Sequence, residues 1–505
     1  MNRKVLVATG LAGAPAVIPL IKKARTLYNN APNAPAAWRR SINSHDKFTH
    51  DSINSLGYDW SRIADPGMSP VFPLRVYLPQ STEDVVHIVN ECKQRGERLV
   101  VRSKGHSSND LVLTRGSVLL VERLTKVLDF NELEQTVTVE PGITLSELDD
   151  FLALRGYGLP VIGTHNHITA GGFASVGGIS AASHRVGLFV DNIVELEYVN
   201  WDGNVITCSR AKRPEDFNRV RMGLGEYGVI TKVKERVYPV NKYHTILVRE
   251  RHSFRDLEKW LAAARTIFEH GDEGALYTRV LWSDFPLRGG KNLTVGSISL
   301  YKETPQSILK NLRNTIQYGY LHRIGFVAGR VAPGLEALFR LWGIIGVLFS
   351  SKYASIKNIE IFIDKIIDYS VGDANRLLII FSPFEVYEQV FRENYDLMQE
   401  YRKRNLVFTF LSCELGPFVS EYLGHGDPKK KFVDIVFEVG VNPDRMTDQL
   451  LEEVIRKMDD ITIKYGAYRY MQTKTSRDPE RRAAVNPNTY YAQQAGGVPV
   501  REEKG

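Results

Sequence analysis

Cysteine is scarce in this chain, which has three in 505 residues: Cys92, Cys208 and Cys413. Cysteines so far apart cannot build a disulfide framework, and they lack the close spacing of a zinc site. A basic stripe interleaved with aromatic residues is also absent, and the net charge of +7 is modest for this length. The sequence therefore predicts neither a metal site nor a nucleic-acid partner.

The sequence also lacks an uninterrupted apolar run near its N-terminus that is long enough to cross a bilayer. Val5–Leu20 is mostly apolar, but it contains two prolines and has basic residues on both flanks. It is shorter than the about 20 residues that a membrane-spanning helix needs. Residues 1–28 are either a signal or anchor segment or a loose or buried apolar arm. The first interpretation predicts a membrane-associated or exported protein in contact with a membrane, and the second a cytoplasmic one.

Internal repeats and low-complexity tracts are missing as well. The chain is 43% hydrophobic and 24% charged, as ordinary globular proteins are. Single cores stop growing at about 250–300 residues, so we expect two domains. The expected division is an apolar segment at 1–28, a linker at 29–57, a first domain at 58–240, a second at 241–465, and a tail at 466–505 that returns to the first domain. The sequence does not indicate an oligomeric state.

The pattern of residues predicts an α+β fold. Ser81-Thr-Glu-Asp84 has the form of a helix N-cap followed by an acid. In Gln135–Glu140, threonines and an acid alternate with valines, as on a half-exposed strand. Apolar residues at helical spacing predict a helix over His252–His270. The strongly apolar segment Leu335–Phe349 is either a core helix or an apolar surface that contacts an apolar substrate or a lipid bilayer.

Glycines concentrate in the segment Thr169–Ile179, which has four of them within eight residues. A second glycine-rich motif follows at Gly223–Thr231. Glycine lets a backbone approach a ligand closely, and successive N–H groups in such a loop can bind a pyrophosphate. These motifs therefore indicate either a nucleotide cradle or a set of tight strand connections.

The order of motifs is more specific than the glycines alone. A helix and a strand lead into Ser103-Lys-Gly-His-Ser107, strands follow, and the glycine block comes about 65 residues later. Over about Phe72 to Val240 this order resembles the FAD-linked oxidase superfamily of the vanillyl-alcohol oxidase type. The resemblance implies a two-domain FAD-binding fold of the PCMH type with an α+β substrate (cap) domain. It also implies that Ser103–Ser107 wraps the FAD pyrophosphate and that His106 is bonded covalently to the flavin.

Locally, the glycine motifs are most similar to those of the cytokinin dehydrogenases. Thr169–Ile179 matches the family pattern at six positions, and Gly223–Thr231 matches a later one. The cofactor-binding residues that the resemblance implies are Ser103, Lys104, Gly105, His106, Ser107, Thr164, Thr169, Gly171, Gly172, Ser175, Gly178, Ile179, Gly228, Val229 and Ile230. No catalytic base is indicated, because Thr164 stands where cytokinin dehydrogenases have their catalytic aspartate.

Other features point in different directions. The tail lacks the His-Trp-Gly-Lys type segment of sugar-lactone oxidases. Doubly linked members of the superfamily have a cysteine just before the glycine block, and this chain has none at that place, so the resemblance implies a single covalent link. Ser183–Phe189 is similar to a segment of the sterol Δ24-reductases, which act on a membrane lipid. His165 and His167, two apart, would share one face of a strand, close to the flavin or simply packed. His184, Glu414 and Tyr468–Tyr470 are further candidates for the cofactor or substrate pocket.

Taken together, these features predict an FAD-dependent oxidase or dehydrogenase. It would transfer hydride from a CH–OH or CH–NH group of a small or lipid-like substrate to the flavin, with a pocket base taking the proton. Two alternatives remain open, namely a lipid C=C reductase that uses NADPH and a flavin-binding protein without turnover. Both the substrate and the electron acceptor are left open.

Overall fold

The computed structural model describes residues 56, 57, 59, 71–163, 168–271, 274–286, 292–305, 307–314, 352–360, 374–405, 408–441 and 447–494. The apolar N-terminal segment 1–28, most of the expected linker at 29–57 and the apolar stretch Leu335–Phe349 lie outside these residues. Within the described residues, no helix has the length and apolar character needed to cross a membrane.

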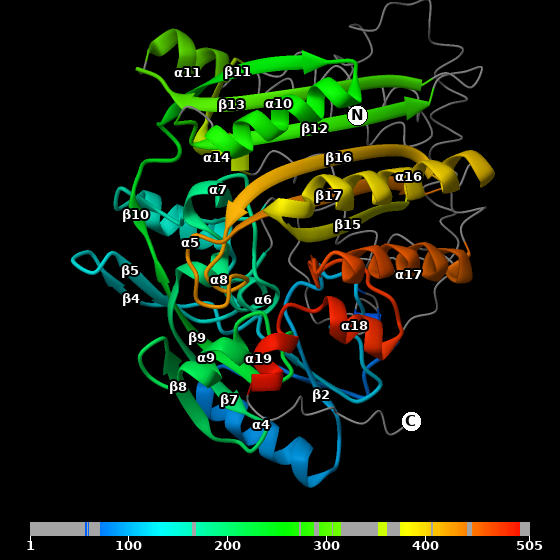
Figure 1. Cartoon of the computed structure of the whole chain (residues 1–505). Helices are drawn as coiled ribbons and strands as arrows, with labels where there is room; N and C mark the ends of the chain where they lie inside the picture. The colour runs from blue at the N-terminus through cyan, green and yellow to red at the C-terminus, as the bar shows by residue number, and fades with distance from the viewer. Residues whose placement is uncertain are drawn as a thin grey trace, which may run out of the picture.

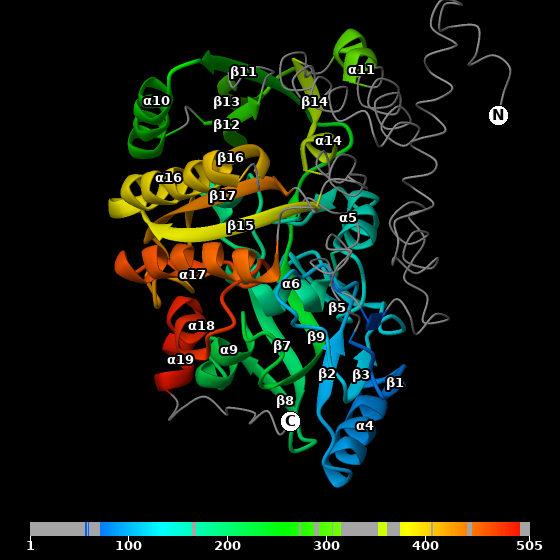
Figure 2. The same cartoon turned by 90° about the vertical axis from the view of Figure 1, so that its right-hand side faces the viewer.

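The N-terminal unit (Figures 1 and 2) contains two larger sheets and a two-stranded antiparallel ladder of β6 (Tyr157–Gly158) and β10 (Tyr238–Pro239). The first sheet is parallel, in the order β1-β3-β2, and consists of β1 (Arg75–Tyr77), β2 (Leu99–Arg102) and β3 (Ser117–Leu120). The second is antiparallel, in the order β4-β5-β9-β7-β8, and consists of β4 (Val127–Asn131), β5 (Thr136–Val139), β7 (Ile193–Asn200), β8 (Val205–Ser209) and β9 (Gly228–Arg236).

Helix α4 (Thr82–Gln94) joins the two sheets through a shared apolar cluster. It begins where the sequence predicts, because the Ser81 side chain accepts a hydrogen bond from the Asp84 N–H at 3.1 Å. The cluster combines one helix face with strands of both sheets: Val85, Ile88, Val89, Cys92, Leu99, Leu119, Val199 and Val229. This packing fixes the carboxyl end of β2, from which the loop of residues 103–107 departs.

The eight-stranded antiparallel sheet forms the second unit, in the order β14-β11-β13-β12-β16-β17-β15-β18. Its strands are β11 (Ile246–Phe254), β12 (Tyr277–Pro286), β13 (Asn292–Glu303), β14 (Tyr353–Ser355), β15 (Ala374–Pro383), β16 (Phe408–Val419), β17 (Lys431–Val441) and β18 (Tyr468–Arg469). The combination of this sheet with the N-terminal unit is an α+β architecture, as the sequence predicts.

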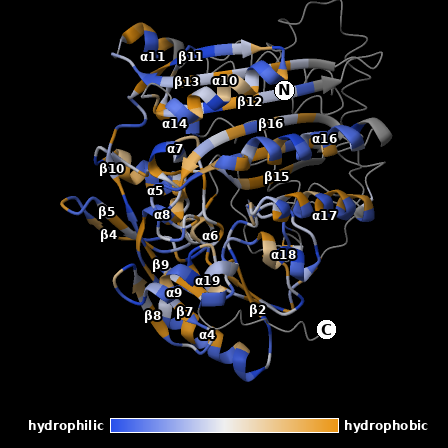
Figure 3. Ribbon diagram, in the orientation of Figure 1, coloured by the Kyte–Doolittle hydropathy of each residue, from blue (hydrophilic) through white to orange (hydrophobic). Residues whose placement is uncertain are grey.

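Three helices cover one face of this sheet: α10 (Leu257–His270), α16 (Tyr387–Asn405) and α17 (Asp448–Lys464) (Figure 2). Side chains alternate between the faces of a strand, so the odd-numbered residues of β17 (Val433, Ile435, Phe437 and Val439) all pack in the apolar cluster with the helices. In Figure 3 these helices carry both orange and blue residues, as amphipathic helices do. The even-numbered residues of β17 therefore face the N-terminal unit.

Two details differ from the sequence expectations. The helix expected from His252 begins at Leu257, with Asp256 as its N-cap, because His252–Phe254 pair with β13 as part of β11. Thr136, expected on an exposed strand face, is only 5% exposed. The error at Thr136 arises because a polar residue in a strand covered by a neighbouring element gives no sign of its burial in sequence.

Candidate functional site

The loop of residues 103–107 follows β2 and is fastened to the C-terminal segment 471–475. Asn109 donates from its side chain to the Met471 carbonyl at 3.1 Å, and the Ser108 N–H donates to the Gln472 carbonyl at 2.7 Å. Gln472 in turn donates from its side chain to the His106 carbonyl. Gly105 has a φ of +71°, and a Cβ there would lie 2.5 Å from the buried Arg102 guanidinium. The loop is thus held on both sides, and it requires glycine at its centre.

The glycine block lies beside this loop. It forms the short helix α6 (Ala170–Val176), whose N-cap Thr169 accepts from the Gly172 N–H at 3.3 Å. The hydroxyl oxygens of Ser103 and Thr169 are 2.5 Å apart, which joins the two segments directly. A Cβ at Gly171 would lie 2.5 Å from the Pro141 side chain. The block therefore packs too closely against its surroundings for a larger residue at Gly171.

A single cavity is lined by most of the residues that the sequence nominates. Twelve of the predicted cofactor residues line it: Ser103, Lys104, Gly105, His106, Ser107, Thr169, Gly171, Gly172, Ser175, Ile179, Gly228 and Ile230. Gly178 does not line it, and Val229 is buried in the apolar cluster with α4. Thr164, His165 and His167 lie outside the described residues.

The donors around this part of the cavity suit a phosphate-bearing cofactor. Lys104 contributes a cation, and the Ser107 hydroxyl is buried without a hydrogen-bond partner among the described residues. A buried hydroxyl without a partner costs free energy, so a ligand group that accepts from it would stabilise the site. The wall around Gly171 and Gly172 adds backbone that a ligand can approach closely. These residues fit FAD, which would lie against the loop of residues 103–107 and the glycine block.

The opposite wall comes from the eight-stranded sheet and carries three acids. Glu414 on β16 and Asp434 and Glu438 on β17 all line the cavity. In the β16–β17 register Glu414 pairs with Val436, so it is the diagonal neighbour of both acids on the same sheet face. Diagonal neighbours lie about 7–8 Å apart. We call these three residues the acidic trio.

Burial changes the acid strength of two members of the trio. It raises the pKa of Asp434 well above its usual value, and the nearby charge of Glu414 adds to this effect. For the same two reasons, in the same order, the pKa of Glu438 rises to about 7. A carboxyl with a pKa near neutrality can exchange a proton at physiological pH. Perturbed carboxyls in a cavity mark a candidate functional site.

Arg279 of β12 is the cation on this wall, and it is held by a helix that also takes part in a buried ion cluster. Arg279 lines the cavity and donates to the Ile359 carbonyl at 3.2 Å, within α14 (Ile356–Glu360). The cluster at α14 joins Lys242 to Glu360 at 3.0 Å and to Asp149 of α5 (Leu145–Ala153) at 3.1 Å. Because α5 belongs to the N-terminal unit, the cluster ties the two units together beside the cavity.

His184 and Tyr470 complete the described wall between the two units. His184, on α7 (Ser183–Val186), has its Nδ1 3.1 Å from the Ala181 carbonyl oxygen and its Nε2 3.2 Å from that of Ala275. Tyr470 follows β18, and burial raises its pKa. Glu414, His184 and Tyr470, suggested by the sequence as pocket residues, all line the cavity.

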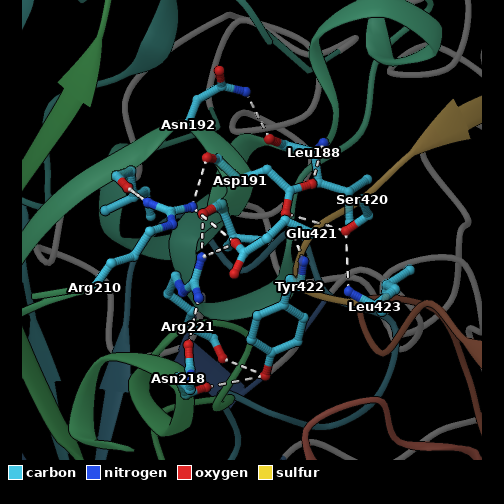
Figure 4. Close-up of polar contacts among 12 residues, drawn as sticks. Leu188, Asp191, Asn192, Arg210, Asn218, Arg221, Ser420, Glu421, Tyr422 and Leu423 are labelled. Carbon is cyan, nitrogen blue, oxygen red and sulfur yellow. Dashed lines mark hydrogen bonds and ion pairs between the residues drawn. The ribbon is translucent and has the colours of Figure 1, made fainter. Parts of the chain in front are cut away.

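A second interdomain contact, shown in Figure 4, fixes the β16–β17 hairpin that carries the trio. Asp191, in α8 (Phe189–Asn192), accepts from the Tyr422 N–H at 2.9 Å and from the Ser420 hydroxyl at 3.2 Å. The fully buried Arg221 lies 3.3 Å from Glu421. Burial raises the pKa of Asp191, although these hydrogen bonds oppose the rise. The hairpin turn is thus anchored on the N-terminal unit.

Asp434, Glu438 and Arg279 are the site residues that sequence reasoning missed. Acids such as Asp434 and Glu438 on one face of a strand are typical of a solvent-exposed face, and nothing in Phe432–Val439 indicates that this face is covered by another unit. A buried face made of acids is visible only once the N-terminal unit is placed against the sheet. Within the described residues, no group of His, Cys, Asp and Glu side chains is arranged to hold a metal ion.

Comparison with known proteins adds a family to this geometry. Residues 73–209 match the model of an FAD binding domain. The chain is 31% identical to D-arabinono-1,4-lactone oxidase of Eremothecium gossypii over 183 residues, which is 35% of this chain and 34% of that protein. It is 29% identical to L-gulonolactone oxidase of Bos taurus over 171 residues, 33% of this chain and 38% of that protein.

The chain therefore aligns with little more than a third of the length of these relatives. The match includes the β2 loop, the glycine block and the strands between them, which are the segments that carry the resemblance in the sequence. FAD is thus the cofactor for which this part of the chain is built. Residues 73–209 are therefore similar to an FAD binding domain and, over about a third of the chain, to these lactone oxidases.

Proposed function

We propose that the chain is an FAD-dependent oxidoreductase that oxidises a CH–OH group of a small substrate. One observation carries this proposal: the acidic trio faces the cofactor-binding loops across a single cavity. The lactone oxidases named above support it, since their printed names describe oxidation of sugar lactones. A hydroxylated compound of that size is therefore the substrate class to test first.

When bound, FAD would supply the acceptor for a hydride, which is two electrons and one proton. The chain then has to bind the substrate between the two walls, hold the hydroxyl against a base and accept its proton. We assign the base to Glu438, because its pKa of about 7 matches the operating pH of a general base. As the substrate C–H bond breaks, Glu438 takes the hydroxyl proton and the carbon becomes a carbonyl.

Arg279 is placed to orient the substrate. Its guanidinium is held at the cavity wall by the Ile359 carbonyl, so it offers a fixed set of donors to a substrate oxygen. Leu377 and Ile379 of β15 line the same wall and exclude water from it. Water exclusion strengthens the electrostatic interactions inside the site.

Anaerobic reduction of the flavin is the experiment that tests this function. The purified yellow protein is mixed with sugar lactones, polyols and simple alcohols in the absence of oxygen, and the visible flavin absorbance is followed. Loss of that absorbance with a hydroxylated compound supports the proposal. Loss with NADPH alone would replace it with the reductase alternative, and a protein purified without FAD would contradict both.

A further inference from the structure

The acidic trio has no partner within the described part of the chain. No hydrogen bond or ion pair joins the carboxyl of Glu414, Asp434 or Glu438 to another described residue. Asp434 is 8% exposed, and its Oδ1 atom is buried without a hydrogen-bond partner. Buried carboxyls are normally paired, because an unpaired one loses its hydration without compensation. The missing partner is therefore expected to arrive with a ligand.

The balance of charge on this wall is uneven. Arg279 is the only basic residue of the eight-stranded sheet among the described cavity-lining residues. It donates to the Ile359 carbonyl and forms no ion pair with the trio within those residues. Three carboxyls thus share one sheet face with a single cation that is directed elsewhere. A neutral ligand would leave the repulsion among ionised carboxyls unchanged, and an anionic ligand would add to it.

The positions of the three acids allow two of them to bind a cation while the third accepts a proton. Glu414 is the diagonal neighbour of both Asp434 and Glu438, and these two acids lie four residues apart on β17, one on each side of it. Four residues of strand span about 13 Å. A cation between Glu414 and Asp434 therefore leaves Glu438 available to accept a proton from another part of the same molecule.

We propose that Glu414 and Asp434 bind an ammonium group of the substrate, so that the substrate is a hydroxylated amine such as an amino alcohol or an amino sugar. This inference rests on the proposed function, because it names the substrate class of the same cavity. The redox step is unchanged: the carbon of the CH–OH group loses a hydride, for which the flavin would be the acceptor, and the hydroxyl loses its proton to Glu438. The ammonium group provides binding energy and takes no part in the bond changes.

A matched ligand series tests this inference on the FAD-loaded protein. Hexylamine, hexan-1-ol and hexanoate share one chain and differ in charge, and their binding is followed by the perturbation of the flavin absorbance. We expect hexylamine to bind at least about tenfold more tightly than hexan-1-ol, a difference of about 1.4 kcal/mol. Equal binding of the amine and the alcohol, or tighter binding of hexanoate, would overturn the inference.

Two variants and a control make the test specific. Asp434→Asn and Glu414→Gln should each weaken hexylamine binding at least about tenfold while changing hexan-1-ol binding less than about twofold. Asp129→Asn removes the same charge from an exposed position of β4 and should change neither. FAD content and melting temperature are measured for every variant, and Glu414→Gln serves if Asp434→Asn does not fold.

Proton release gives a second readout that does not depend on affinity alone. Burial favours the protonated form of Asp434, and an ammonium beside it favours the ionised form. Calorimetry in two buffers of different ionisation heat should therefore detect protons released by hexylamine and none released by hexan-1-ol. FAD-loaded protein that oxidises an alcohol but shows no preference for the amine would sink this inference and leave the proposed function standing.

Discussion

The hydroxyl oxygens of Ser103 and Thr169 lie 2.5 Å apart although the two residues are 66 positions apart in the chain. This contact joins the loop after β2 to the N-cap of α6, the two segments that the cofactor has to bridge. Thr169 makes two contacts with one hydroxyl, because it also accepts from the Gly172 N–H. The geometry of the cofactor-binding wall therefore depends on this one hydroxyl.

Replacing Thr169 tests that dependence. Thr169→Ala removes an N-cap and an interloop hydrogen bond, so we expect a loss of about 1–2 kcal/mol in the free energy of unfolding. Thr169→Ser keeps the hydroxyl and should lose less than half of that. Urea unfolding of the FAD-loaded proteins measures both. Equal losses in the two variants would show that the methyl group, and not the hydroxyl, matters.

His106 should carry a covalent flavin. The sequence resemblance implies the bond, and the structure places His106 on the cavity wall in a loop held by Gln472. A denaturing gel of the purified protein should show a fluorescent flavin band that is absent from His106→Ala. His270→Ala, at the C-terminal end of α10, is the matched control and should keep the band. A yellow native protein with a dark band would rule out the covalent bond.

The rate of flavin reduction should depend on pH through Glu438. Its raised pKa of about 7 means that the carboxyl is protonated below that pH and ionised above it. Only the ionised form accepts a proton, so the rate should rise as the pH increases through about 7 and then level off. Stopped-flow reduction across this range measures it.

Glu438→Gln should lower that rate by about 10²–10⁴-fold and abolish the pH step. Glu132→Gln, on the exposed segment after β4, should leave both unchanged. A pH step that survives in Glu438→Gln would transfer the role of the base to another group.

Lys242 should be a large contributor to stability. Lys242→Met leaves Glu360 buried without its cation, whereas Asp149 keeps Lys357 at 3.2 Å, and we expect a loss of about 3 kcal/mol, the low end for buried pairs. In the variant the neutral form of Glu360 becomes more favoured, so the folded pKa of this carboxyl rises further. Stability from such a shift is present below the unfolded pKa and is lost as the pH rises. The deficit relative to wild type should therefore grow from pH 5 to pH 8 in thermal unfolding.

Lys93→Met provides the comparison for that measurement. Lys93 pairs with Asp202 at 2.6 Å, but both side chains are more than half exposed. Exposed ion pairs contribute at most about 1 kcal/mol. A deficit of the same size in both variants would mean that burial does not determine how much these ion pairs contribute to the free energy of unfolding.

Arg221 should hold the β16–β17 hairpin in place. Arg221→Met removes the buried contact with Glu421, for which we expect a loss of about 3 kcal/mol, the low end for buried pairs because Arg210 also contacts Glu421. The hairpin carries the acidic trio, so Km for the substrate should rise more than kcat falls. Arg221→Lys should recover part of the stability, because lysine keeps the positive charge but lacks the planar guanidinium group. If Arg221→Met is destabilised but its Km is unchanged, Arg221 contributes to stability and not to substrate binding.

Much of the cofactor-binding wall could be predicted from the sequence, because its motifs are local. The glycines in Thr169–Ile179 and in the Gly105-His106 turn indicate, within a few residues, that the backbone can approach a ligand closely. The substrate wall could not be predicted in the same way. Glu414 and Asp434 meet only through the pairing of β16 with β17, and which strand face is covered depends on how the two units pack.

The alternation along β17 has a consequence for how such a protein can change. Odd-numbered residues from Val433 to Val439 build the layer shared with the helices, and residues 434, 436 and 438 line the cavity. Substitutions at residues 434, 436 and 438 can therefore alter what the cavity accepts while the layer beneath them stays intact. A strand with this division lets substrate preference diverge between relatives without a matching loss of stability. The substrate can therefore change during evolution while the fold is conserved.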